Sequence, residues 1–557
     1  MNEKREMMKQ TAHDPTTVLV NLFKKVENRI KITFFCAIGA GLLAHVYQFT
    51  NKLFNYDELG HTPGGFGSGI ELGRWGLELF GRLTSLFFGN YSLPMVNGMI
   101  ALLFFAISAC LILSILDIKD GVFAGITGAL CTVFPAVTST YFFMYTAPYY
   151  ALALLLSCLA AWFVIKYPAK WQSYVFGVLL LALSTGIYQS YFSIAVCLVL
   201  ADLILRCMDR QQETTNPEIV KVPLTTNESD LWKVILKIGL QRFLFLIAGL
   251  LLYFLINKAV LFFSGIAMLD YQGLSDMGKV GVFELLSSVL RGYSDFLRMI
   301  RADVLQTNPT ILVKGGIFVL GIGVLAALVK TLADKRKATP IKVLLLIFVL
   351  LFPIAVFLVY VMAAGGAFVY TLMSYSLVFM FLVPLAVIEH VWMRSEEHEK
   401  KERQFQTVFS WSGSIAGIVA VLVYIWFANG NYQALQYTDY HDLAYYTVMM
   451  TQVKSLDGYQ DNLPVAIIGE EITDETNRAG SLMGTSFAIG GKGDTNVSSY
   501  SNLNILTQYL GFMPSFLWDD DLEEISEKEA VKAMPCYPTD GAIAIVDDVI
   551  IIKLQDE

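Results

Sequence analysis

The stretch IKITFFCAIGAGLLAHVYQFTNKLFNYDELG, residues 30–60, sets the architecture of the chain. Residues 30–50 are almost uncharged and long enough to cross the roughly 30 Å hydrocarbon core of a bilayer as an α-helix. The polar segment that follows carries two adjacent acids, Asp57 and Glu58. The stretch therefore predicts a membrane-spanning helix that is followed at once by two carboxylates at a membrane surface.

Apolar runs of similar length recur along the chain of 557 residues. Hydrophobic residues make up 55% of the sequence and charged residues 16%, whereas charged residues make up about 25% of typical soluble domains. This composition predicts an all-α polytopic membrane bundle of about eleven transmembrane helices. Because residues 1–28 are polar and no small-residue cleavage site follows the first run, that run is interpreted as a retained anchor. The expected helices cover residues 30–50, 92–116, 121–138, 146–166, 171–187, 190–206, 243–264, 310–331, 343–363, 370–393 and 408–428.

Lysine and arginine residues predict the orientation, because cytoplasmic loops of membrane proteins carry an excess of them. With eleven helices, the basic loops all fall on one side, so the N-terminal tail (1–29) is expected to be cytoplasmic. The outer loops 51–91 and 265–308 and the C-terminal region 429–557 are then expected to face outward. The residues that decide this are Lys24, Lys25, Arg29, Lys31, Arg206, Arg210, Lys233, Lys237, Arg242, Lys335, Arg336, Lys337, Arg394, Lys400, Lys401 and Arg403.

The charge balance divides the chain into two parts. The net charge is −8, but residues 429–557 hold 21 acidic and 6 basic residues, which is −15 and leaves +7 for the remainder. This split predicts a transmembrane domain (30–428) and an acidic extracytoplasmic domain (429–557), and nothing in it indicates nucleic-acid binding. The tail is expected to be a small α/β domain with a strand at 464–470, a helix at 519–534 and a hairpin at 541–554 that turns at Asp547 and Asp548.

Cysteine and histidine residues do not show the spacing of metal ligands, so no metal site is predicted from them. Only Cys536 lies in the tail, which therefore cannot close an internal disulfide. His45, in the first apolar run, is interpreted as a packed residue and not a catalytic one. Asp202 is expected to form a structural ion pair with Arg206, one helical turn further on.

The acidic pair is expected to lie just above the membrane, between the first helix and an amphipathic helix that begins at Glu71. An apolar cleft or a neighbouring like charge raises the pKa of a carboxylate, and a raised pKa suits a general base. The alternative is a solvated loop with two exposed acids. The second helix is predicted to lie in the membrane interface, because its charges share one face with alternating sign; these are Glu71, Arg74, Glu78 and Arg82.

Most of the chain, from about residue 15 to the end, resembles the GtrII-type membrane glucosyltransferases, which modify bacterial surface polysaccharides and belong to the GT-C class. The likeness is one of pattern, without a single diagnostic signature. It lies in FNYDELGHTPGG followed by ELGRWGLELFG (54–81), NYSLPMVNG (90–98), FPAVTSTYFFMYTAPYYALA (134–153), LALSTGIYQSYFSIA (181–195) and MPCYPTDGAIAIVDDVIIIKL (534–554).

The resemblance implies a GT-C-like fold and a polyprenyl-phosphate-linked sugar donor. GT-C enzymes carry an acidic catalytic motif in the first extracytoplasmic loop, and Asp57 and Glu58 occupy that place. Inversion at the anomeric carbon is the expected outcome. A Mg²⁺ or Mn²⁺ ion held by the acidic pair is compatible with this chemistry, but some relatives work without a metal, and no cofactor is assigned. The implied location is the bacterial cell membrane.

A lipid-phosphate donor needs cations and sugar-binding groups near the outer interface. Each candidate also has a structural interpretation: a snorkelling lysine, a self-paired amphipathic helix at 283–300, an arginine held by Glu71 and Glu78, or the aromatic belt found at every membrane interface. Guanidinium groups suit phosphate, and aromatic rings and amides suit sugars. The candidates are Arg74, Lys258, Arg291, Arg298, Tyr145, Tyr188 and Gln189.

The leading hypothesis is a glycosyltransferase that moves a sugar, glucosyl by resemblance, from a polyprenyl-phosphate donor to a cell-surface polysaccharide or other glycan acceptor. One alternative is a polysaccharide polymerase or ligase that uses lipid-linked sugars. A second is a transporter or flippase of a polar lipid, although the apolar runs are nearly free of the central charges that transporters use.

Overall fold

The computed structural model of the protein describes residues 14–61, 69–89, 92–208, 231–269, 282–301, 310–362, 370–394, 400–469 and 502–555. Parts of the predicted N-terminal tail, of the outer loop 265–308 and of the C-terminal region lie outside these residues. All nine candidate site residues lie within them.

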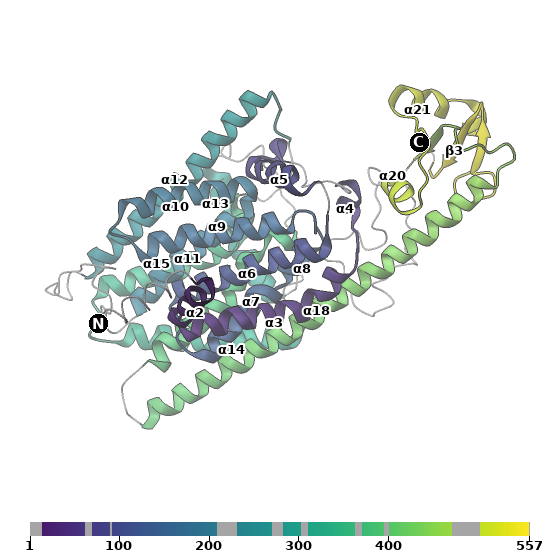
Figure 1. The fold of residues 1–557 in the computed structure, drawn as a ribbon. Coiled ribbons are helices and arrows are strands. Elements are labelled where there is room, and N and C mark those ends of the chain that lie inside the picture. Colours follow the sequence, from purple (N-terminus) through teal and green to yellow (C-terminus); the bar gives the residue numbers. More distant parts are fainter. Residues whose placement is uncertain are drawn as a thin grey trace.

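The described residues form a bundle of helices from which one long helix projects (Figure 1). Among these residues, ten helical segments are long and apolar enough to cross a membrane, and an eleventh apolar helix, α10 (Trp171–Ile187), is slightly shorter. The predicted all-α polytopic fold is therefore confirmed. The long segments contain α3 (Asn28–Thr50), α6 (Pro94–Leu116), α7 (Gly121–Val133) with α8 (Pro135–Tyr141), α9 (Ala147–Lys166), α11 (Phe192–Met208), α12 (Leu231–Ser264), α14 (Ile311–Ala333), α15 (Thr339–Val356), α17 (Phe379–Ile388) and α18 (Lys400–Lys454).

Two breaks interrupt the apolar helices. The helix predicted at 121–138 divides into α7 and α8, because Phe134 is extended and Pro135 begins the second helix. Between α10 and α11 the chain makes a short 3₁₀ turn, η2 (Gln189–Tyr191). The second break places the backbone turn that carries Gln189 beyond the end of α10.

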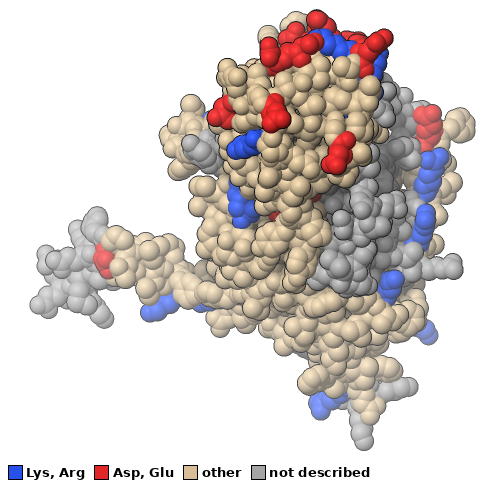
Figure 2. Space-filling model, turned by 90° about the vertical axis from the view of Figure 1, so that its right-hand side faces the viewer, with Lys and Arg blue, Asp and Glu red and all other residues tan. Residues whose placement is uncertain are grey.

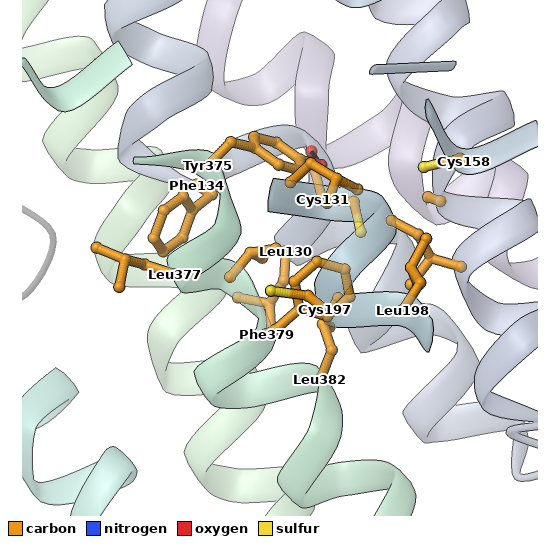
Figure 3. Close-up of a cluster of buried hydrophobic side chains, with 14 of the residues drawn as sticks. Leu130, Cys131, Phe134, Cys158, Cys197, Leu198, Tyr375, Leu377, Phe379 and Leu382 are labelled. Atoms are coloured by element: carbon orange, nitrogen blue, oxygen red, sulfur yellow. Dashed lines mark hydrogen bonds between the residues drawn. The ribbon is translucent and has the colours of Figure 1, made fainter. Parts of the chain in front are cut away.

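The centre of the bundle is close-packed and apolar. Figure 3 shows Leu130, Phe134, Tyr375 and Phe379 converging from different helices, and the Tyr375 hydroxyl donates to the Cys131 carbonyl oxygen at 2.8 Å. Figure 3 also shows Cys158 and Cys197 among apolar neighbours, as expected for buried thiols that act as small hydrophobes.

Helices α3 and α7 approach closely because small residues line their contact. A side chain on Gly128 would meet the Thr33 carbonyl oxygen at 2.1 Å, and the Thr33 hydroxyl donates to the Ala124 carbonyl at 3.1 Å. His45 of α3 is buried, with Nδ1 2.7 Å from the Tyr432 hydroxyl and Nε2 2.8 Å from the carbonyl oxygen of Thr132. The interpretation of His45 as a packed residue is confirmed.

One end of the bundle, which we call the Asp117 end, is joined by ion pairs. Asp117 accepts from Arg29 at 3.0 Å and from Arg394 at 3.1 Å. Burial alone would raise the pKa of Asp117, but the positive charges of Arg394, Arg29 and Lys119 outweigh it and lower that pKa. Glu389, 2% exposed, accepts from the Lys119 amide at 2.7 Å and from Arg394 at 3.0 Å. This end is tied together by compensated charge.

The predicted pair of Asp202 and Arg206 lies near this end and is confirmed, with 2.6 Å between the Arg206 Nε and the carboxylate. Arg242 of α12, which is fully buried, donates to the same carboxylate oxygen. Lys166 lies within electrostatic range of both Asp117 and Asp202. The ion pairs therefore connect α11 and α12 as well.

The last long helix, α18, leads out of the bundle. Its 55 residues correspond to about 80 Å at 1.5 Å per residue, far more than a bilayer requires. Figure 1 shows α18 beside α3 and then extending to the C-terminal domain. The boundary predicted at residue 428 falls inside this continuous helix and stays a prediction.

The C-terminal domain holds a three-stranded sheet in the order β1-β3-β2, with β1 (Val465–Ile468) parallel and β2 (Ile543–Val546) antiparallel to β3 (Val549–Lys553). The predicted strand and hairpin are confirmed, and Asp547 and Asp548 make the turn with φ of 52° and 60°. The helix predicted at 519–534 is two short helices, α21 (Asp519–Ser526) and α22 (Glu529–Lys532). Figure 2 shows charged side chains gathered at the top of this end of the molecule, over the region of α21 in Figure 1.

Candidate active site

Asp57 and Glu58 occupy the first turn of a short helix, α4 (Tyr56–His61), at the end of the bundle opposite the Asp117 end. The preceding residue Asn55 starts this helix, because its side-chain oxygen accepts from the Glu58 amide at 2.8 Å. Negative side chains are favourable in a first helical turn. The sequence Asn-Tyr-Asp-Glu therefore explains both the helix start and the position of the two acids.

Glu58 is 1% exposed and connects three segments. Its Oε1 accepts from the Ser92 hydroxyl, which precedes α6, and its Oε2 accepts from the Tyr145 amide at 3.0 Å, which precedes α9. The Lys52 ammonium lies 3.8 Å from Oε1. Burial raises the pKa of Glu58, and Lys52 and the two hydrogen bonds oppose that rise only in part. The raised carboxyl pKa expected for this pair is therefore found at Glu58, the buried acid of the two.

Asp57 lies on the same helix turn but is partly exposed. Burial and then the negative charge of Asp57 raise the pKa of the Tyr145 phenol well above its usual value, so Asp57 faces the same group of side chains as Glu58. The alternative of two fully exposed acids in a solvated loop is wrong for this pair. The two neighbours differ: Glu58 is buried and holds the segments together, while Asp57 is partly exposed.

The amphipathic helix predicted from Glu71 onward is wrong in its first turn. The chain forms a 3₁₀ turn, η1 (Ile70–Leu72), then Gly73 with φ of 68°, and the helix α5 begins only at Trp75 and ends at Phe88. A side chain on Gly73 would also meet the Tyr253 hydroxyl at 2.7 Å. The remainder is the predicted amphipathic helix, since Arg82 donates to Glu78 at 2.6 Å and the apolar side chains at Leu79, Leu83 and Leu86 are exposed. Its place in the membrane interface stays a prediction.

Arg74 therefore sits at the break and not on a helical face. Its Nη1 donates to the Tyr150 hydroxyl at 3.1 Å, and its guanidinium carbon lies 5.3 Å from the centre of the Tyr188 ring. The Tyr150 and Tyr188 rings stack at 4.2 Å. Arg74 also lies within electrostatic range of Tyr145, as Asp57 and Glu58 do. Arg74, Tyr145 and Tyr188 are thus brought together with the acidic pair.

Gln189 lies beside this group, but its amide nitrogen is used for structure. It donates to the Leu72 carbonyl at 2.7 Å and to the Tyr253 hydroxyl at 3.2 Å, and Tyr253 donates to the Gly73 carbonyl at 3.2 Å. These bonds hold the turn that precedes Arg74. The predicted contact of Gln189 with a sugar stays a prediction, while its observed contacts fix the backbone next to the guanidinium.

Three predicted cations lie elsewhere. Lys258 is exposed on α12, next in sequence to the buried Asn257, so it points to another side of that helix from Tyr253 and Asn257. Arg291 and Arg298 are exposed on α13 (Val282–Arg301), which packs against α15 and α16 (Leu358–Met362). The structure does not place these three with the Arg74 group, and their contact with a lipid phosphate stays a prediction.

A divalent ion at the acidic pair also stays a prediction. Within the part of the chain that the structure describes, no group of three or more His, Cys, Asp or Glu side chains is arranged to hold a metal.

Sequence reasoning did not assign Lys52, Ser92, Tyr150 or Tyr253. Tyr253 and Asn257 carried a usable signal, because they are polar residues one helical turn apart inside an apolar run. The partnership of Ser92 with Glu58 has no sequence signal, since it depends on how the loops meet.

A helical membrane bundle with a partly exposed aspartate, and with an arginine over stacked tyrosines at the same end, fits the class of membrane-embedded glycosyltransferases. The family model described as Glucosyl transferase GtrII matches residues 46–381, more than half of the chain, and the chain belongs to this family of membrane glucosyltransferases. The match includes α4 and the Arg74 group and ends before α18 and the C-terminal domain. No curated protein and no solved structure matches the chain.

Proposed function

We propose that this membrane glucosyltransferase takes a glucosyl residue from a polyprenyl-phosphate donor and transfers it to a glycan acceptor, such as a cell-surface polysaccharide, on the outer face of the bacterial cell membrane. The observation that carries the proposal is the partly exposed Asp57 at one end of the bundle, which lies within electrostatic range of Tyr145 as Arg74 does, together with the contacts of Arg74 with Tyr150 and Tyr188. A lipid donor reaches such a site from the membrane with its phosphate at the surface.

Arg74 binds the donor phosphate in this proposal. Its planar guanidinium suits bidentate contact with phosphate oxygens, and the turn that carries it is held by Gln189 and Tyr253. The stacked rings of Tyr150 and Tyr188 support the guanidinium from one side.

Asp57 acts as the general base. It takes the proton of an acceptor hydroxyl while that oxygen forms a bond to the anomeric carbon of the glucosyl group. The bond between the anomeric carbon and the phosphate oxygen breaks, and the lipid phosphate leaves with the electron pair. Attack opposite the leaving phosphate inverts the anomeric configuration. Glu58 does not take this role, because both of its oxygens already accept hydrogen bonds in a buried position.

The test is transfer of labelled glucose in vesicles that contain the purified full-length protein. The expected result is label moving from polyprenyl-phosphate-glucose to an added glycan, one glucosyl residue at a time, with no transfer from UDP-glucose alone. Transfer from UDP-glucose without lipid would contradict the proposed donor. Long chains of added units would indicate a polymerase, and movement of the lipid between leaflets without transfer would indicate a flippase.

A further inference from the structure

The helix that carries the acidic pair has a second face, which packs into the C-terminal domain. Phe54 and Leu59, 1% and 0% exposed, belong to an apolar cluster separate from the core of the bundle. The other members come from the end of α18 and from the C-terminal domain, and include Tyr446, Met449, Val453, Ile505, Leu506 and Ile550. Figure 1 shows α4 between the bundle and this domain, close to α20 (Asn502–Asn504).

Two directed contacts accompany this apolar packing. The Phe54 amide donates to Asp439 of α18 at 3.1 Å, and Asp439 is 3% exposed. The Phe54 ring lies 4.9 Å from the ring of Tyr509, in the turn η9 (Ile505–Tyr509) of the C-terminal domain. Burial, and then the charges of Asp439 and Glu58, raise the pKa of Tyr509. Tyr509 thus lies within electrostatic reach of Glu58, the neighbour of Asp57.

A helix of six residues is too short to be stable alone, so its position depends on what holds its two sides. Glu58 ties one side to the loops before α6 and α9. Phe54 and Leu59 tie the other side to α18 and the C-terminal domain. In the sequence, Asp57 lies between Phe54 and Glu58, which belong to these two attachments.

We propose that α18 and the C-terminal domain together position the catalytic Asp57, through the contacts of Asp439 and Tyr509 with Phe54, and so control the rate of transfer. Asp439 and Tyr509 are positioning residues that do not touch the reacting atoms, and both lie outside the residues that match the family model. This inference rests on the proposed function, since it concerns the same site. It differs from a role in acceptor recognition, because it predicts a change in kcat and not in the KM of the acceptor.

The first test compares Tyr509→Ala with Tyr509→Phe in the full-length protein, with Met513→Ala as a matched control. Met513 is 79% exposed in the same segment. Loss of the ring should lower kcat about 10- to 100-fold, as expected for a displacement of about 1 Å at the reacting group. The KM values of donor and acceptor should stay close to wild type, and Tyr509→Phe should restore kcat because it keeps the ring.

The second test compares Asp439→Ala with Asp439→Asn, which retains an oxygen that accepts from the Phe54 amide. Tyr440→Ala is the control, since Tyr440 is the next residue of α18 and is 56% exposed. The alanine variant should lose turnover and the asparagine variant should keep most of it. Amide hydrogen exchange in residues 52–61 should become faster in Tyr509→Ala and Asp439→Ala. This readout does not require activity, and global misfolding is recognised by faster exchange along the whole chain.

The outcomes separate this inference from the proposed function. Wild-type kcat in both alanine variants, a raised acceptor KM alone, or unchanged exchange in residues 52–61 would overturn the positioning role. If an alanine variant misfolds, Asp439→Asn with wild-type exchange but strongly reduced kcat would also overturn it. Failure of the wild-type protein to transfer glucose would refute the proposed function, whatever the exchange measurement shows about α4.

Discussion

The two ends of the helical bundle hold their carboxylates in opposite ways. At the Asp117 end, Arg29, Arg394 and Lys119 surround the carboxylate of Asp117 and lower its pKa. At the α4 end, Glu58 is held by a hydroxyl, a backbone amide and one lysine at 3.8 Å, and its pKa is raised. Fully compensated charge joins helices, whereas incompletely compensated charge near an accessible acid is typical of a site that does chemistry.

The arginines at the two ends of the bundle also contact different groups. Arg394 donates to two carboxylates, while Arg74 contacts a tyrosine hydroxyl and the face of another tyrosine. A guanidinium over aromatic rings also suits the bidentate phosphate contact proposed for Arg74.

The largest difference between the two ends is expected when one aspartate at each end is replaced by asparagine. Asp57→Asn should lower kcat by about 10²- to 10⁴-fold, the usual contribution of a general base, without changing the apparent melting temperature. Asp117→Asn should lower the apparent melting temperature, because it weakens the bonds to Arg29 and Arg394, and should leave kcat unchanged. Transfer assays and thermal unfolding in detergent measure the two effects. Wild-type turnover in Asp57→Asn would contradict the assignment of catalysis to the α4 end.

The next largest effect is expected when Arg242, the buried partner of Asp202, is removed. Arg242→Leu should destabilise the protein by about 3 kcal/mol, at the lower end of the range for breaking a buried pair, because Arg206 still contacts Asp202. Turnover of the folded fraction should not change. Arg336→Leu is the control, since the side chain of Arg336 is 65% exposed in its pair with Asp334. A large loss of kcat in Arg242→Leu would mean that this end also takes part in the reaction.

A smaller effect is expected for Arg74→Lys. A lysine cannot provide two parallel hydrogen bonds, so kcat/KM for the lipid donor should fall about 10- to 100-fold. The matched control is Arg82→Lys on α5, where the arginine is 72% exposed and pairs with Glu78. Equal activity of both variants would exclude Arg74 from phosphate binding.

The smallest effect concerns pH and Glu58. A carboxyl group with a raised pKa favours folding below that pKa, and this contribution is lost as the pH rises through it. In Glu58→Gln the group cannot ionise, so the apparent melting temperature of wild type should fall relative to the variant as the pH rises from the ordinary carboxyl pKa of 4.5 through the raised one. Parallel melting curves for the two proteins across this range would show that burial does not penalise the charged form of Glu58.

Features that depend on local pattern could be predicted from the sequence. The apolar runs predicted the helices, and alternation around Asp547 and Asp548 predicted the hairpin. The helix predicted from Glu71 was wrong in its first turn, because Gly73 takes a left-handed conformation under Tyr253, a contact 180 residues away. Continuation of α18 into the tail was not anticipated either, since its second half lacks an apolar run.

The difference between Asp57 and Glu58 could not be predicted, because it depends on partners that are distant in sequence. Ser92 is 34 residues from Glu58 and Tyr145 is 87 residues from it. The attachment of α4 to Asp439 spans 385 residues. The sequence could indicate that an acidic pair mattered, but only the folded chain shows which of the two acids is accessible.

The central claim is that the donor binds at the α4 end of the bundle, and photo-crosslinking tests it most directly. A polyprenyl-phosphate-glucose analogue with a photoreactive sugar is bound to the full-length protein in vesicles, and the sample is irradiated. The labelled peptides are then identified. We predict label in residues 54–61, 70–82 or 145–150, beside Asp57 and Arg74. Label confined to residues 117–120 or 389–394, at the Asp117 end, would contradict the account.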